Sequence, residues 1–226
     1  MPTTTPTGRF AGQRLAPPQR PAIRTLADAI RHGSPGRLPL ANRLSRWQRQ
    51  NRDNFERSLH DQAEFEAGRL WAIGHLWVAV ARRDGRVQDY GLVSCRVVTT
   101  AGVGFIVDAF QNLVEMENMK FHGIGTGSTA EAASQTALVT ELTTQYSVDN
   151  TRPTGTTSEQ SGNANVYETV ATVTVDSAVT ITEHGIFSQA ATGGGVMLDR
   201  SVFTGVPLGS AESMLCTYRL TFPSGG

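Results

Sequence analysis

Residues 165–188 read NVYETVATVTVDSAVTITEHGIFS, and this stretch decides the fold class. It is rich in Val, Thr and Ile, which favour extended backbone, and it holds two strand-length runs, 165–175 and 178–188. Asp176-Ser177 separates the runs and supplies turn-forming residues. The first run is apolar on both of its alternating faces. A strand of that kind predicts a second partner surface, which is consistent with oligomerisation.

The same texture continues on both sides of this stretch. Towards the C-terminus we predict strands at 196–204 and 213–222, bounded by the turns 193–195 and 208–210. Towards the N-terminus, runs at 76–81 and 87–99 flank Arg83-Asp84-Gly85-Arg86, a tight hairpin turn, and 119–125 is extended. Residues 70–226 therefore predict a mainly β domain, an antiparallel β-sandwich or jelly-roll-like fold.

One helix interrupts the strand pattern. Residues 102–113 (GVGFIVDAFQNL) have helical spacing, and five apolar residues share one face. Those residues are Val103, Ile106, Val107, Phe110 and Leu113.

The first 69 residues differ in composition from the rest. Residues 1–39 carry seven of the ten prolines, which exclude a long helix or a central strand and predict an extended arm. Residues 40–69 predict an amphipathic helix with Trp47 and Phe55 on its apolar stripe and Gly68 as its stop. The start of the chain has no signal-peptide pattern, and no apolar run is long enough to span a membrane.

The charge is zero overall but unevenly divided. Residues 1–60 hold eleven arginines and three acidic residues, a net charge of +8, and the remainder carries −8. This division predicts an arm that lies on an acidic protein surface, which could belong to a neighbouring copy. Nucleic acid is an unlikely partner, because the arginines are spread singly among prolines with few aromatic residues between them.

No motif specifies a reaction. His122-Gly-Ile-Gly-Thr-Gly-Ser has GxGxG spacing without a Walker lysine, so we interpret it as a tight loop that lets other backbone pass close by. Glu183 and His184 are adjacent in a strand and point to opposite faces. His122 and His184 could approach one another in the fold, with Ser128, Ser134 or Asp199 nearby, but no spacing supports a triad.

Asp199-Arg200 is predicted to form a strand-end ion pair. Cys95 and Cys216 are predicted to be buried free thiols, with a disulfide as the alternative. We therefore predict that the chain is not an enzyme and has no catalytic, cofactor-binding or metal-binding residues.

Several segments of the C-terminal half match proteins of a known kind. They are FHGIGTGSTAEAASQTALVTEL at 121–142, ITEHGIFS at 181–188, LDRSVF at 198–203 and TYRLTF at 217–222. Together they make residues from about 97 to 226 resemble structural proteins of tailed-bacteriophage virions. The resemblance implies a β-sandwich that assembles as a symmetric oligomer, with a trimer favoured, and acts by contact. It also implies that the protein is assembled in the host cytoplasm and resides in the virion.

The leading hypothesis is a capsid decoration (cement) protein that binds the major capsid protein or another virion protein. Its arm would make the contacts, and the helix stripe of Trp47 and Phe55 would serve self-association. The arm residues expected at the contact are Arg9, Phe10, Arg14, Arg20, Arg24 and Arg37. The alternatives are a tail or baseplate component, a hydrolase that uses His122 or His184, and a nucleic-acid-binding protein.

Overall fold

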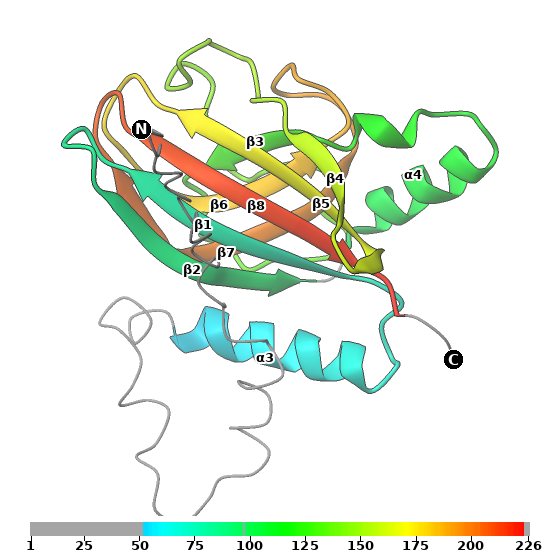
Figure 1. Cartoon of the computed structure of the whole chain (residues 1–226). Helices are drawn as coiled ribbons and strands as arrows, with labels where there is room; N and C mark the ends of the chain where they lie inside the picture. Colours follow the sequence, from blue (N-terminus) through cyan, green and yellow to red (C-terminus); the bar gives the residue numbers. More distant parts are fainter. Residues whose placement is uncertain (1–51, 97, 224–226) are drawn as a thin grey trace, which may run out of the picture. The chain divides into compact units, whose positions relative to one another are not determined.

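The computed structural model describes residues 52–96 and 98–223, and the side chains from residue 56 onward. These residues belong to one compact unit. Its strands form two antiparallel sheets, as the sequence predicts (Figure 1). No helix among the described residues is long and apolar enough to cross a membrane.

The larger sheet has five strands in the order β2-β1-β8-β5-β4. Their bounds are Val87–Arg96 for β2, Ile73–Ala81 for β1, Ser213–Thr221 for β8, Asn163–Thr174 for β5 and Thr156–Gln160 for β4. β1 and β2 are joined by the predicted turn, in which the Gly85 N–H donates to the Arg82 carbonyl (2.9 Å) and Gly85 has φ 81°. Glycine suits this position because it adopts positive φ without a Cβ clash.

The smaller sheet has three strands in the order β3-β6-β7. They span Phe121–Gly125, Val179–Phe187 and Met197–Leu208. β7 runs four residues beyond its predicted end and includes Pro207. Proline is tolerated there because β7 pairs only with β6 and its other side is an edge.

The two sheets face one another across a shared apolar core. Side chains from both sheets form one buried cluster, whose largest members include Leu76, Ile124, Ile181, Phe203 and Met214. Burial of this kind is the main stabilising term of the fold. The outer face of the smaller sheet is covered by the connection 126–155, which sequence patterning does not assign to any element. Leu138 of this connection packs on Phe187 and Met197.

In the described part of the chain, the helices α3 and α4 flank the sheets (Figure 1). α3 (Arg52–Glu66) falls within the predicted helix 40–69, and Gly68, with φ 72°, follows its last turn as expected. α3 lies beside β2, where the Ser58 hydroxyl accepts the Cys95 N–H (3.1 Å). α4 (Thr100–Phe110) is the predicted inserted helix and is followed by the 3-10 turn η2 (Met116–Asn118).

Candidate functional site

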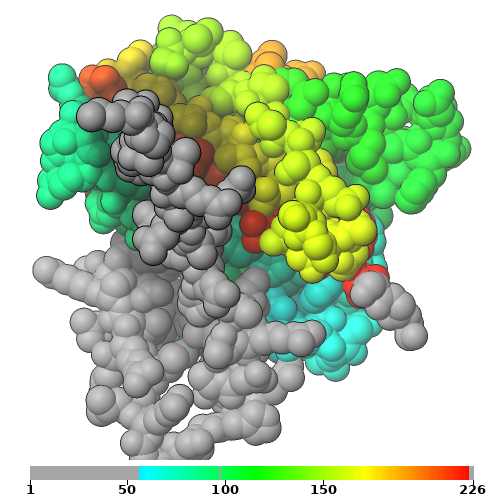
Figure 2. All heavy atoms as spheres, in the orientation of Figure 1, coloured from blue at the N-terminus to red at the C-terminus, as the bar shows by residue number. Residues whose placement is uncertain are grey.

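Four large apolar side chains are exposed on α4 and the turn after it. They are Val107, Phe110, Leu113 and Met116, with exposed fractions of 50, 85, 67 and 41%. We call these residues the α4 ridge. Figures 1 and 2 show α4 (green) standing out beside the strands. Clustered apolar exposure of this kind is typical of a surface that another molecule covers.

The local sequence explains why this face of α4 points outward. The Thr99 side chain caps the helix by accepting the Gly102 N–H (2.9 Å), and its hydroxyl donates to the Met197 carbonyl (2.6 Å). Phe105 and Ile106 are then buried in the core. Val103, Ile106, Val107 and Phe110 have i, i+3, i+4 and i+7 spacing and share one side of α4, as the sequence predicts. Burial divides this side: Ile106 is buried, whereas Val107 and Phe110 are exposed, as is Leu113 beyond the end of the helix.

A shallow groove adjoins the α4 ridge at Met116. It has a volume of about 440 Å³ and is lined by Met116, by β4 and β5 residues including Tyr167, and by Phe222. Trp71, 46% exposed, lies against Phe222 with ring centroids 5.8 Å apart. Apolar surface thus continues from α4 toward the end of β8.

A second notable cluster lies inside the sandwich. His122 from β3 and His184 from β6 approach each other, with 3.0 Å between His122 Nδ1 and His184 Nε2. The Thr169 hydroxyl is 3.2 Å from His122 Nε2. Cys216, from β8 of the larger sheet, completes the group, and one donor atom from each of the three residues lies within 4.8 Å of the other two. His122, His184 and Cys216 are each 0% exposed.

Burial governs the protonation of this cluster. It lowers the pKa of His184 to about 3 and raises the pKa of the Cys216 thiol to about 12, and no charged side chain contributes to either shift. The pKa of His122 is also lowered, by burial first and by His184 second. Both imidazoles are therefore neutral at pH 7. Neither ring is exposed to solvent.

Asp199 does not form the predicted ion pair with Arg200. Arg200 instead pairs with Glu183, with 2.7 Å between Arg200 Nη2 and Glu183 Oε2. Asp199 points between the sheets, where its Oδ1 accepts the Ser201 hydroxyl (3.1 Å) and burial raises its pKa to about 7. Neighbouring side chains of a strand face opposite sides of a sheet. Asp199 and Arg200 are neighbours in β7, so their side chains point away from each other and cannot pair.

The glycine-rich segment after His122 serves close packing, as the sequence indicates. A Cβ on Gly127 would lie 2.6 Å from Glu183 Oε1, and one on Gly125 would lie 2.5 Å from the same oxygen. Only glycine allows the backbone to come so near the buried carboxylate. Glu183 and His184 point to opposite faces, as expected.

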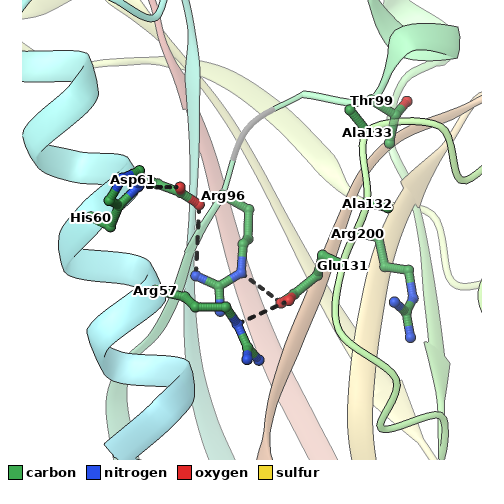
Figure 3. Close-up of a pocket in the computed structure, with 9 residues that line it drawn as sticks. All are labelled: Arg57, His60, Asp61, Arg96, Thr99, Glu131, Ala132, Ala133 and Arg200. Atoms are coloured by element: carbon green, nitrogen blue, oxygen red, sulfur yellow. Dashed lines mark hydrogen bonds and ion pairs between the residues drawn. The ribbon is translucent and has the colours of Figure 1, made fainter.

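A charged pocket of about 260 Å³ lies between α3, β2 and the connection 126–155 (Figure 3). Arg96, 3% exposed, donates to Glu131 (2.6 Å) and to the Ser58 hydroxyl (2.7 Å). Glu131 also accepts the Val202 N–H (2.6 Å). Arg57 and Arg96 both pair with Glu131, so these charged side chains join α3, β2 and the connection.

The residues proposed from sequence as contacts lie mostly outside the described part of the chain. Phe55 belongs to α3, but its side chain is not among those described. The others outside the described residues are Arg9, Phe10, Arg14, Arg20, Arg24, Arg37 and Trp47.

The α4 ridge was not proposed as a contact from sequence, although a signal existed. Phe105, Ile106 and Val107 are consecutive, so the helix is apolar on more than one side, and one surface cannot bury all of them. Cys95 and Cys216 are buried free thiols, as predicted.

The comparisons with known proteins add no identity. No family model, curated protein or solved structure matches the chain.

Proposed function

We propose that this chain is a non-enzymatic structural protein of a tailed-bacteriophage virion, most specifically a capsid decoration protein that acts by contact with the major capsid protein. The observation that carries the proposal is the α4 ridge, in which Phe110 is 85% exposed. The resemblance of residues from about 97 to 226 to phage virion proteins supplies the class of assembly.

The ridge offers apolar surface that a partner can bury. Fully burying an exposed Phe or Leu side chain is worth about 1.5–3 kcal/mol, and the entropy lost on association offsets part of that gain. Phe110 and Leu113, 85 and 67% exposed, therefore contribute less than about 6 kcal/mol together. A shell presents the same docking site many times, and an oligomer that engages several sites gains avidity beyond any one contact. The arginine-rich segment at 1–60 adds electrostatic attraction to an acidic partner surface.

The interior chemistry favours this proposal over a hydrolase. The histidines available for general-base catalysis lie between the sheets at 0% exposure. The charged pocket beside α3 is occupied by the mutual contacts of its own arginine and glutamate side chains. A protein that acts by binding a partner needs a rigid body that presents a surface. The buried histidines and the paired charges of the pocket both contribute to that rigidity.

The test is binding of the purified full chain to expanded empty shells of the parent phage. The double variant Phe110→Asp/Leu113→Asp should bind at least about 100-fold more weakly, since charge replaces the apolar contact. The matched control is Val87→Asp/Val148→Asp, which alters two other exposed apolar residues (70 and 62% exposed) and should bind like the unaltered chain. Circular dichroism checks that both variants keep their strands.

Shell binding by the ridge variant at full strength would refute the contact role of α4. Copy number then separates the positions in the virion. A decoration protein is present in hundreds of copies per particle, whereas a tail or baseplate component is present in tens or fewer.

A further inference from the structure

The cluster of His122, His184 and Cys216 lies between the two sheets, and all three residues are 0% exposed. His122 Nδ1 faces His184 Nε2, and His122 Nε2 faces the Thr169 hydroxyl. One donor atom from each of the three residues lies within 4.8 Å of the other two, so three possible metal ligands meet at one buried place.

The donor atoms match a metal site in type, and they lie within 4.8 Å of one another. Two neutral imidazoles and a thiol offer nitrogen and sulfur ligands, which suit soft or borderline ions such as copper and zinc. Two metal–nitrogen bonds of about 2.0 Å at tetrahedral or trigonal angles place the nitrogens about 3.3–3.5 Å apart. His122 Nδ1 and His184 Nε2 are 3.0 Å apart, so the rings need to separate by only a few tenths of an ångström. The Thr169 hydroxyl beside His122 Nε2 orients that ring in the manner of an outer-shell ligand.

The charge inside the sandwich decides between a monovalent and a divalent ion. A buried net charge is costly unless an opposite charge compensates it. The three residues whose donor atoms gather here are fully buried, and neither a neutral imidazole nor a thiol carries a charge, so compensation must come from the complex itself. One thiolate and two neutral imidazoles neutralise a monovalent ion and leave a divalent ion with an excess positive charge. Three ligands are also enough for copper(I), whereas structural zinc almost always takes four.

We propose that His122, His184 and Cys216 bind one copper(I) ion between the two sheets. Binding replaces the proton of the Cys216 thiol, which is released to solvent as the copper–sulfur bond forms, and copper stays in its +1 state throughout. The ion then links β3 and β6 of the smaller sheet to β8 of the larger one. Because the ligands are fully buried, copper enters as the chain folds, and the loaded protein resists unfolding more than the copper-free protein.

The experiment measures copper in the full chain, expressed in copper-supplemented cells and purified without oxygen. The unaltered chain should carry about one copper per molecule, and its melting temperature should fall when copper(I) is removed by a strong chelator. Cys216→Ala should lose at least about nine-tenths of the copper, because the remaining imidazoles leave the ion's charge uncompensated. Cys95→Ala is the matched control, since Cys95 is the chain's other buried free thiol and lies outside the cluster. It should retain the copper.

X-ray absorption on the unaltered protein makes the test independent of how Cys216→Ala folds. The expected inner shell is one sulfur and two nitrogens around copper(I). A chain purified without copper, copper retained in Cys216→Ala, copper lost equally in Cys95→Ala, or zinc taken up in place of copper would each overturn the assignment.

Discussion

Glu183 is the best place to test how the smaller sheet is held under its covering connection. This residue is 0% exposed and lies on the outer face of β6. Its Oε1 accepts the N–H groups of Gly127 (3.0 Å) and Thr140 (2.7 Å), and its Oε2 accepts that of Val139 (3.0 Å). Arg200 Nε donates to Oε2 at 2.8 Å. One carboxylate thus fixes three backbone positions of the connection and compensates one buried guanidinium.

The perturbation is Glu183→Gln, which keeps the size of the side chain and removes its charge. Breaking a buried ion pair by altering one partner costs about 3–5 kcal/mol, because the other charge stays buried without compensation. The amide also turns an NH₂ group toward N–H donors that need an acceptor. We therefore expect a decrease of about 3–5 kcal/mol in the free energy of unfolding, a large part of the roughly 5–15 kcal/mol of an ordinary domain.

The assay is urea unfolding of the full chain, followed by fluorescence and by circular dichroism. Glu168→Gln is the control, because Glu168 pairs with Arg219 at 2.5 Å while both side chains stay partly exposed (18 and 24%). Such pairs contribute about 0–1 kcal/mol. The double variant Glu183→Gln/Arg200→Met no longer buries an uncompensated guanidinium. The free energy of unfolding of this double variant should therefore fall by about 0.5–3 kcal/mol less than the sum of the two single-variant decreases. A Glu183→Gln cost below about 1 kcal/mol, or strict additivity with Arg200→Met, would refute this reasoning.

Two further outcomes follow from the same structure. In urea unfolding, Gly102→Ala should destabilise the protein by about 1–3 kcal/mol, because its Cβ would lie 2.7 Å from the Leu198 carbonyl oxygen. Gly104→Ala in the same helix is the control. Its Cβ meets nothing within 4 Å, so this variant should stabilise the protein by about 0.5–1 kcal/mol. Burial raises the pKa of Asp199 from 3.8 to about 7. Between these values the folded protein keeps a proton that the unfolded chain releases. The contribution of Asp199 to the free energy of unfolding therefore falls as pH rises from about 4 to 7. Thermal melts should therefore show Asp199→Asn more stable than the unaltered chain at pH 8 and equal to it at pH 4; equal stability at both pH values would contradict the buried, protonated carboxyl.

Sequence patterning predicts most of the strands because their signals are local. The runs of Val, Thr and Ile at 165–175, 178–188 and 213–222 each became a strand within two residues of the predicted ends. The Asp84-Gly85 turn and the helix end at Gly68 each require a residue with positive φ. Glycine adopts positive φ readily, so its place in the sequence predicts both features.

The parts that the sequence did not predict depend on contacts between distant segments. The connection 126–155 has no repeating pattern, because it is held by single contacts such as the ion pair of Arg152 with Glu141 (2.5 Å). Glu183 and His184 are adjacent in the chain, yet one binds this connection and the other meets residues of β3 and β8. The histidine–cysteine cluster draws one residue from each of three strands, so no ligand spacing reveals it.

The buried charged side chains also limit which surfaces of the described residues a partner can bind. The connection 126–155 is long enough to be a mobile binding loop, but Glu183 and Arg152 attach it at several points, and Arg152 also lies over the Phe187 ring at 3.5 Å. The β2 edge is occupied by Ser58 of α3, and the β7 edge is contacted by Thr99 and Glu131. Among the described residues, α4 and the adjoining groove are an apolar surface that a partner can cover without displacing these internal contacts. A partner that binds there meets a rigid support, because Phe105 and Ile106 anchor the same helix in the core. Rigidity lowers the entropy lost on docking, which suits the contact role proposed for this surface.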